Sequence, residues 1–293
     1  MDIRRRIMQC SSQNINDDTE ESIKAGDVVY YANNKLNVCK LDNWSTSLGT
    51  AIGVVVIPPN ILPDGKCRII SLKFVNYQGS AVSNNTTTTY WYNSTSDTSL
   101  NNYTSCPLLS TNDGNIDDYT TAYGGYLPSD NFDGETCYMD NETKYNVSVS
   151  GGVVPSPYYN NATELNPLYT LTISGGNILS DFNGYNNTTT LYNLGTRYRA
   201  ARGCYLYNDG SSSTKWHLPS VGETCFFMVR SKIISDSITA LGGISPYVDQ
   251  IIWTSTEYDR TNAYIYNPVQ GYISYQRKSG ATLIRPFATI DLQ

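Results

Sequence analysis

The chain has 293 residues, enough for two or three domains of about 100–150 residues each, and 40% of its residues are hydrophobic, which supports real cores. Its formal net charge of −6 argues against nucleic acid as the main partner. Only 16% of the residues are charged, and Tyr (25 residues), Asn, Ser and Thr take their place. Such a composition suits adhesive proteins and fibres, or alternatively reflects a β-rich fold from an AT-rich genome.

No segment approaches the about 20 consecutive apolar residues of a membrane span, and the first residues contain no apolar region of a signal peptide. We therefore expect a protein made in the bacterial cytoplasm, for which release on a particle after lysis fits better than export. The seven cysteines are scattered, odd in number and without a CxxC pair, which favours buried free thiols over a disulfide framework or a zinc ribbon. No cofactor and no metal is expected.

The polar sequence of residues 1–25 predicts an extended arm, which could become ordered when it binds a partner protein. Residues 26–75 predict a small β-module, with Asn33 and Asn34 forming a tight turn and Gly53 marking a bulge or a close backbone approach. The expected strands of this module cover residues 27–31, 36–39, 51–57 and 67–72.

Residues 76–150 predict an Asn/Thr/Tyr-rich region of short strands and long loops. Its aromatic patch, residues 90–92, either contacts a ligand or partner or packs in the core, and the burial preference of large aromatic rings favours the core. The acidic positions around 117–118 and 130–140 could bind a cation or serve a glycosidase, but a solvated loop is the simpler interpretation.

Residues 151–293 predict an α+β unit in which helices precede a group of strands. One helix is expected over residues 197–207, and a second begins at Ser220, where Ser220 and Glu223 have the spacing of a capping box. A third helix is expected from Ser235 to the glycine pair at 242–243. Consecutive antiparallel strands are then expected at residues 263–266, 271–275 and 282–287.

The order of short stretches in this half resembles that of the C-type-lectin-like domains of Bacteroidota and their phages, which are related to the Lcl C-terminal and Fibrobacter paralogous domains. The resemblance, with the β-module included, covers about two thirds of the chain. We call the following matching positions the landmark residues: Pro155 to Tyr158, Leu179 to Gly184, Asn187, Thr188, Ala200, Ala201, Cys204, Trp216 to Ser220, Gly222, Glu223, Trp253 to Tyr258, Ala263, Gly271, Lys278 and Ile284 to Phe287.

The resemblance implies an N-terminal small β-module followed by a C-terminal C-type-lectin-like domain over residues 151–293. It also implies a virion structural protein, a head fibre or capsid decoration protein of a Bacteroidota-infecting phage, located on the particle exterior. The N-terminal arm would contact other capsid proteins, the chain would form a homo-dimer or homo-trimer, and the lectin-like domain would touch host glycans or capsule. The alternative is a host-encoded surface adhesin with the same domain.

The residues that would make such a fold catalytic or calcium-dependent are missing or doubtful. The Glu-Pro-Asn or Gln-Pro-Asp loop and the Trp-Asn-Asp strand of calcium-dependent lectins do not occur. Cys204 and Cys225 fall at core-like helical positions and do not suggest the active-site pair of a formylglycine-generating enzyme. The single histidine, His217, would have to serve any Ser-His-Asp triad, and a core role is favoured. We therefore expect a binding or structural protein and no enzyme.

A ligand surface, if present, is expected on the exposed aromatics of the last strands, Tyr264, Tyr266, Tyr272 and Tyr275. The alternative is that these tyrosines pack across neighbouring strands. The landmark residues themselves are expected to be structural, and Glu257 is expected to pair with Arg285 or with backbone donors.

Overall fold

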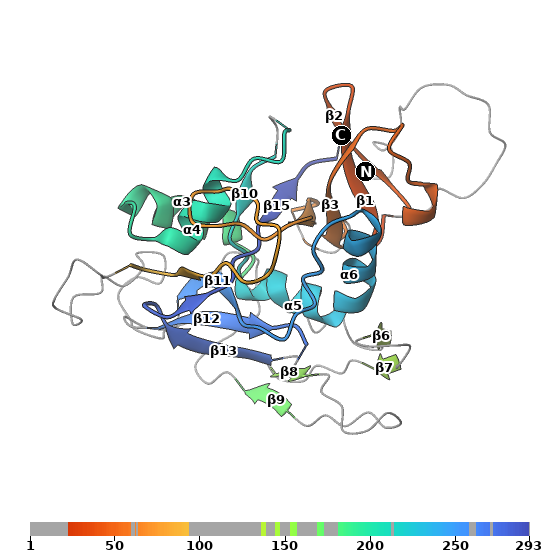
Figure 1. Ribbon diagram of the computed structural model, residues 1–293. Helices are drawn as coiled ribbons and strands as arrows, with labels where there is room; N and C mark the ends of the chain where they lie inside the picture. The colour runs from red at the N-terminus through yellow and green to blue at the C-terminus, as the bar shows by residue number, and fades with distance from the viewer. Residues whose placement is uncertain are drawn as a thin grey trace, which may run out of the picture.

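The computed structural model describes residues 23–59, 62, 64–93, 136–138, 144–146, 153–156, 169–172, 181–211, 214–257, 262–269 and 272–292. Within them it contains helices and mostly antiparallel sheets, which confirms the predicted α+β class (Figure 1). Almost all of the predicted arm, residues 1–22, and most of residues 94–180 lie outside the described residues.

The largest sheet has six strands in the order β10-β15-β4-β3-β1-β2, and all of its neighbours are antiparallel. The last strand along the chain lies inside this sheet, between β10 and β4, and Phe287 of β15 is the register partner of Ile70 of β4. One sheet thus contains strands from both sides of the boundary predicted between the β-module and the lectin-like domain. Its strands are β1 (Val28–Ala32), β2 (Lys35–Cys39), β3 (Thr50–Ile57), β4 (Cys67–Ser71), β10 (Trp216–His217) and β15 (Phe287–Ile290).

The turn chemistry of this sheet follows the sequence closely. Asn33 and Asn34 connect β1 to β2 with φ of 51° and 62°, the left-handed region that asparagine tolerates. Gly53 lies where a Cβ would come within 2.6 Å of the Ile70 carbonyl oxygen, and the β1–β3 register shifts beside it, between Val29 and Tyr30. Both predictions for these positions, a tight turn and a close backbone approach, are confirmed.

Three of the helices were expected from the sequence. They are α4 (Arg199–Leu206), α5 (Val221–Val229) and α6 (Ser231–Ala240). Ser220 is the N-cap of α5, and its backbone N–H donates to Glu223 Oε2 at 2.8 Å, so the capping box is confirmed. The third helix begins at Ser231, four residues before the predicted Ser235, and Gly242 follows its end with φ of 73°.

A further helix, α3 (Gly184–Leu194), was not predicted. Its buried positions, Gly184, Asn187, Thr188 and Leu191, have the spacing of one helix face, but only one of them is a large apolar residue. Because Asn and Thr are weak helix formers, propensity and hydrophobic period both fail to mark this segment. This helix is instead stabilised by hydrogen bonds from its buried polar face to distant parts of the chain.

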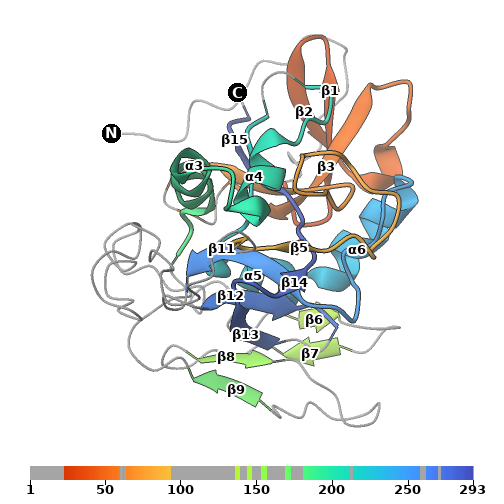
Figure 2. The ribbon, with the colours of Figure 1, turned by 60° about the vertical axis from the view of Figure 1, so that its left-hand side comes forward.

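The three-stranded sheet consists of β11 (Ile252–Glu257), β12 (Asn262–Asn267) and β13 (Tyr272–Arg277) and lies on the side of the molecule away from β1 and β2 (Figures 1 and 2). Tyr264 and Tyr266 pack in one core with residues of α5 and α6, whereas Ala263 and Ile265 pack in a second core with residues of α3 and α4. The central strand β12 is therefore covered on both of its faces.

The predicted strand at residues 282–287 does not extend this meander, which corrects that expectation. The chain instead divides into β14 (Ala281–Thr282), which pairs with β5 (Thr89–Tyr90), and β15, which joins the six-stranded sheet. Pro286 lies between the two and lacks the N–H that a continuous ladder needs. Two further antiparallel strand pairs are described, β6 (Thr136–Tyr138) with β7 (Lys144–Asn146) and β8 (Val153–Ser156) with β9 (Tyr169–Thr172).

Two indole rings attach the segment around β5 to β11. Trp91 Nε1 donates to the Thr254 carbonyl at 2.8 Å, and Trp253 Nε1 donates to the Thr89 carbonyl at 3.0 Å. Trp91 and Tyr92 are 1% and 7% exposed and pack in the core, whereas Tyr90 is half-buried. These reciprocal bonds connect parts of the chain more than 160 residues apart.

We expect Trp91→Phe to lower the free energy of unfolding by about 1–3 kcal/mol, because the ring is kept while the buried Thr254 carbonyl loses its donor. Trp44→Phe is the matched control, since Trp44 is half-buried, packs on Tyr30 of the first hairpin and donates no indole hydrogen bond to any of the described residues. Denaturant unfolding monitored by far-UV circular dichroism measures both. Equal losses for the two variants would contradict the role given to the Trp91 bond.

Candidate functional site

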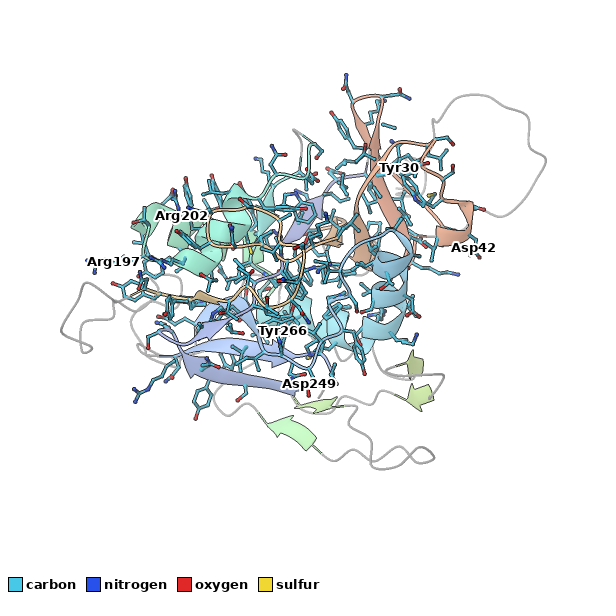
Figure 3. All side chains as sticks on the ribbon, viewed as in Figure 1. Tyr30, Asp42, Arg197, Arg202, Asp249 and Tyr266 are labelled. Carbon is cyan, nitrogen blue, oxygen red and sulfur yellow. The ribbon has the colours of Figure 1, made fainter. Side chains whose placement is uncertain are left out.

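The structure separates the four tyrosines predicted as a ligand surface. Tyr264 and Tyr266 are buried, with exposed fractions of 5% and 0%, so the expectation that they are exposed is wrong. Figure 3 labels Tyr266 among the surrounding side chains. Tyr275 is 52% exposed on β13, and the side chain of Tyr272 lies outside the described residues. Tyr266 instead packs edge-to-face on Phe227 of α5, with ring centroids 6.0 Å apart.

The physical reason lies in the two helix groups that flank β12. A strand at the surface of a meander exposes every second side chain, and the alternation of tyrosines on β12 suggested that pattern. Because α5 and α6 cover the face that carries Tyr264 and Tyr266, alternate side chains of β12 point into two different hydrophobic cores. Tyr275 is the register partner of Tyr264, but it lies on the edge strand and reaches solvent.

Polar landmark residues from three distant segments meet inside the molecule. They come from the start of α3, from β10 and the start of α5, and from β11, and they are joined by one charged residue of β4. We call this group the buried polar centre; its members are Arg68, Asp181, Asn187, His217, Ser220, Glu223, Ser255 and Thr256, none more than 2% exposed.

Asp181 connects the three segments through its backbone and its side chain. Its carbonyl oxygen accepts hydrogen bonds from Ser220 Oγ at 2.6 Å and from Gly222 N at 3.0 Å, at the start of α5. Its carboxyl oxygen Oδ2 accepts from Thr256 Oγ1 at 2.6 Å and from Asn187 Nδ2 at 3.1 Å. Burial raises the pKa of Asp181 to about 7, although the hydrogen bond from Thr256 acts in the opposite direction.

Glu223 is the charged member that the surrounding groups keep ionised. Burial alone would raise its pKa, but the contacts with His217 and the Arg68 guanidinium lower it below its usual value. Glu223 Oε1 lies 3.1 Å from His217 Nε2 and 3.4 Å from Arg68 Nε. Arg68 also pairs with Asp64, Nη2 to Oδ2 at 2.6 Å, and this second carboxylate lies near the surface.

The His217–Glu223 pair has no room for a substrate. Both side chains are fully buried, and a Cβ placed on Gly184 would come within 2.3 Å of Glu223 Oε2 and 2.7 Å of His217 Cδ2. The recorded hydrogen bonds of His217 go to Glu223, while its Nδ1 is buried without a partner, so no serine or threonine nucleophile is attached to the ring in the described part of the chain. His217 is a core residue, as expected from its position.

A second buried ion pair joins two other landmark residues. Lys278 donates to Glu257, both side chains are 1% exposed, and the Lys278 ammonium lies 4.9 Å from the centre of the Trp91 ring. Arg285, one of the two alternatives expected for Glu257, donates instead to the carbonyl oxygens of Ser71 and Ile244, so that alternative is wrong. The difference arises because Arg285 lies between β4 and the loop after α6, whereas Lys278 lies in the turn beyond β13.

Two of the described thiols, those of Cys67 and Cys204, are buried, and that of Cys39 is half-buried. Cys39, Cys67 and Cys204 are free, and burial raises the pKa of Cys67 to about 12 and that of Cys204 well above its usual value. The side chain of Cys225 lies outside the described residues. Across the described ranges, no group of three or more His, Cys, Asp or Glu side chains is arranged to hold a metal ion. None of the described helices combines the length and the apolar character needed to cross a membrane.

No protein-family model matches this chain, and no curated protein sequence matches it. Among solved structures, it is similar to the crystal structure of a fimbrial protein from Bacteroides ovatus, with a TM-score of 0.45 and 16% sequence identity over 92% of this chain. The aligned part is 49% of the fimbrial protein, so the chain spans about half the length of that structure.

Proposed function

We propose that the protein is a structural protein of a phage particle, a head fibre or capsid decoration protein of a phage that infects Bacteroidota. In this proposal residues 151–293 form a C-type-lectin-like domain that faces outward and attaches to glycans of the host surface. The N-terminal arm mounts the protein on other capsid proteins, and the protein acts by binding, without catalysis.

The enclosure of the buried polar centre supports a structural role for its titratable residues. An enzyme needs titratable groups that a substrate can reach. Here Asp181, His217 and Glu223 are each fully buried. His217 is hydrogen-bonded to Glu223, and Asp181 accepts hydrogen bonds from the start of α5 and from β11, so these residues stabilise the fold. The assignment to a phage particle rests on the order of the landmark residues and on the Tyr-, Asn- and Thr-rich composition.

An antiserum against the purified chain tests the location. Cultures of the organism that carries the gene are induced to release particles, which are banded by density and labelled with immunogold, and washed cell envelopes are analysed in parallel. We expect the chain in the banded particles and gold on the head exterior. Detection in the envelopes of cells that release no particles would reject the proposal in favour of a host-encoded surface adhesin.

Tyr275→Ala tests whether β13 carries the attachment surface. Because the side chain is 52% exposed, its truncation is expected to leave the fold intact, which is not true of the buried Tyr264 or Tyr266. We expect weaker binding of the fluorescently labelled chain to host cells and an unchanged midpoint of thermal unfolding. Unchanged cell binding would exclude Tyr275 from the attachment surface.

A further inference from the structure

A strip of arginine and tyrosine side chains crosses the surface of helices α3 and α4, away from β13. The Arg202 guanidinium lies 5.4 Å from the centre of the Tyr192 ring, and Tyr192 stacks on Tyr205 with ring centroids 4.0 Å apart and an interplanar angle of 22°. Arg199 lies 4.7 Å from the centre of the Tyr77 ring. We call these five residues the Arg–Tyr strip; Arg202 marks its place in Figure 3.

The fold brings these side chains together through the solvent face of α4. Ala200, Ala201, Gly203 and Cys204 are buried, which leaves Arg199, Arg202 and Tyr205 on the opposite side of this helix. Tyr192 reaches this side from α3.

Tyr77 reaches α4 because a glycine lets the backbone of its turn approach. A Cβ on Gly203 would lie 2.5 Å from the Asn76 carbonyl oxygen and 3.1 Å from Tyr77 Cα. Tyr77 and Tyr205 are 38% and 36% exposed, so the strip carries aromatic rings that solvent reaches at both of its ends.

The charge of this surface is opposite to that of the whole chain. Residues 184–206 contain three arginines and no acidic residue, in a protein of net charge −6. Among the residues that the structure describes, no carboxylate pairs with Arg199 or Arg202, whose recorded contacts are the two tyrosine rings. Asp209, the next acidic residue along the chain, accepts hydrogen bonds from Ser211. As far as the described residues go, both guanidinium groups therefore keep N–H donors that an external anion can use.

We propose that the Arg–Tyr strip binds an anionic polysaccharide, a polymer of pyranose units that carries carboxylate or sulfate groups. The planar guanidinium fork matches both oxyanions with paired hydrogen bonds. Tyrosine rings offer rigid apolar faces for the C–H side of a pyranose ring and hydroxyl groups for its edge. A linear polymer fits a surface in which charged and aromatic groups alternate along a strip.

Single-stranded nucleic acid is the other polymer that combines charge with flat rings, and the number of basic groups in the strip disfavours it. The net charge of −6 acts against both polymers, but single-stranded nucleic acid also needs a groove of basic groups that follows the phosphates of successive nucleotides, and the strip has two guanidinium groups. This inference goes beyond attachment through β13, because it assigns a different surface and a ligand class, and it does not depend on a location in a phage particle.

The test is retention of the full-length chain on immobilised polygalacturonate and heparin, with neutral dextran as the uncharged comparison. We expect salt-sensitive retention on both anionic polymers and none on dextran. The double variant Arg199→Gln/Arg202→Gln is expected to weaken binding about tenfold or more, because each lost guanidinium removes a charge-assisted contact. Tyr205→Ala, which keeps both charges, is expected to weaken binding as well.

The matched control is Lys35→Gln/Lys66→Gln, which also removes two positive charges, but from exposed positions outside the strip. It is expected to bind like the unmodified chain, and circular dichroism verifies that all variants are folded. Lack of retention of the unmodified chain, an equal loss in the lysine control, or tighter binding of single-stranded oligothymidylate than of polygalacturonate would each overturn the proposal.

Discussion

Glu223→Ala is expected to lower the free energy of unfolding by about 3–5 kcal/mol, because it leaves the Arg68 guanidinium buried without its inner carboxylate. The same change removes the acceptor of the Ser220 N–H at the start of α5 and the partner of His217. Urea unfolding at neutral pH, followed by circular dichroism, measures the loss. Glu223→Gln keeps the shape and one acceptor oxygen and is expected to fall between the unmodified chain and Glu223→Ala.

Asp236→Ala provides the matched control for the loss of a carboxylate. Asp236 pairs with Lys232 one helical turn away on α6, Nζ to Oδ2 at 2.6 Å, and its side chain is 59% exposed. We expect a change below about 0.5 kcal/mol, because solvent screens an exposed pair of this kind. If Glu223→Ala cost no more than Asp236→Ala, the buried polar centre would not stabilise the fold in the way argued.

The parts of the fold that the sequence predicted are those with strong local signals. The β1–β2 hairpin has two asparagines at its turn, β3 is an unbroken apolar run, and α5 begins with a capping box at Ser220 and Glu223. In each case the residues that specify the element lie within it. The strand at residues 282–287 failed because its pairing partners, β4 and β5, lie about 200 residues earlier in the chain.

Buried polar groups explain most of what the sequence did not predict. Helix α3 depends on Asn187 and Thr188, which bond to Asp181 and to the backbone of Leu218. A hydrophobic period cannot mark a helix whose inner face is polar. Arg68 was also missed as a member of the buried polar centre, since nothing near it in sequence points to Glu223. A basic residue inside a strand otherwise rich in buried side chains is the one available signal.

The same reasoning changes where binding should be sought. The four tyrosines of the last strands were predicted as a ligand surface because they alternate along the strands. Tyr264 and Tyr266 are core residues, and Tyr275 reaches solvent. The Arg–Tyr strip gave no periodic signal, because Tyr77 comes from a turn more than a hundred residues before α4. A surface that combines exposed aromatic rings with guanidinium groups from distant segments forms only in the folded chain, so the sequence pattern of any one segment does not predict it.

Asp181 predicts a stability that falls as the pH rises from 5 to 8. Its pKa is about 7 in the folded chain, and the ordinary value of 3.8 applies to the unfolded chain, so the folded state binds more protons between these values. The stability from the neutral carboxyl group is complete below about pH 4 and is lost as the pH rises through 7. The full difference corresponds to about 4 kcal/mol.

Asp181→Asn is expected to flatten this dependence, because the amide does not titrate. The variant also changes the hydrogen bonds with Asn183 and Thr256, which shifts its stability by an offset common to all pH values. Urea unfolding at pH 5, 6, 7 and 8 compares the slopes of stability against pH for the two proteins, and contributions common to both cancel in the difference. Parallel curves for the two proteins would show that Asp181 does not hold its proton in the folded state.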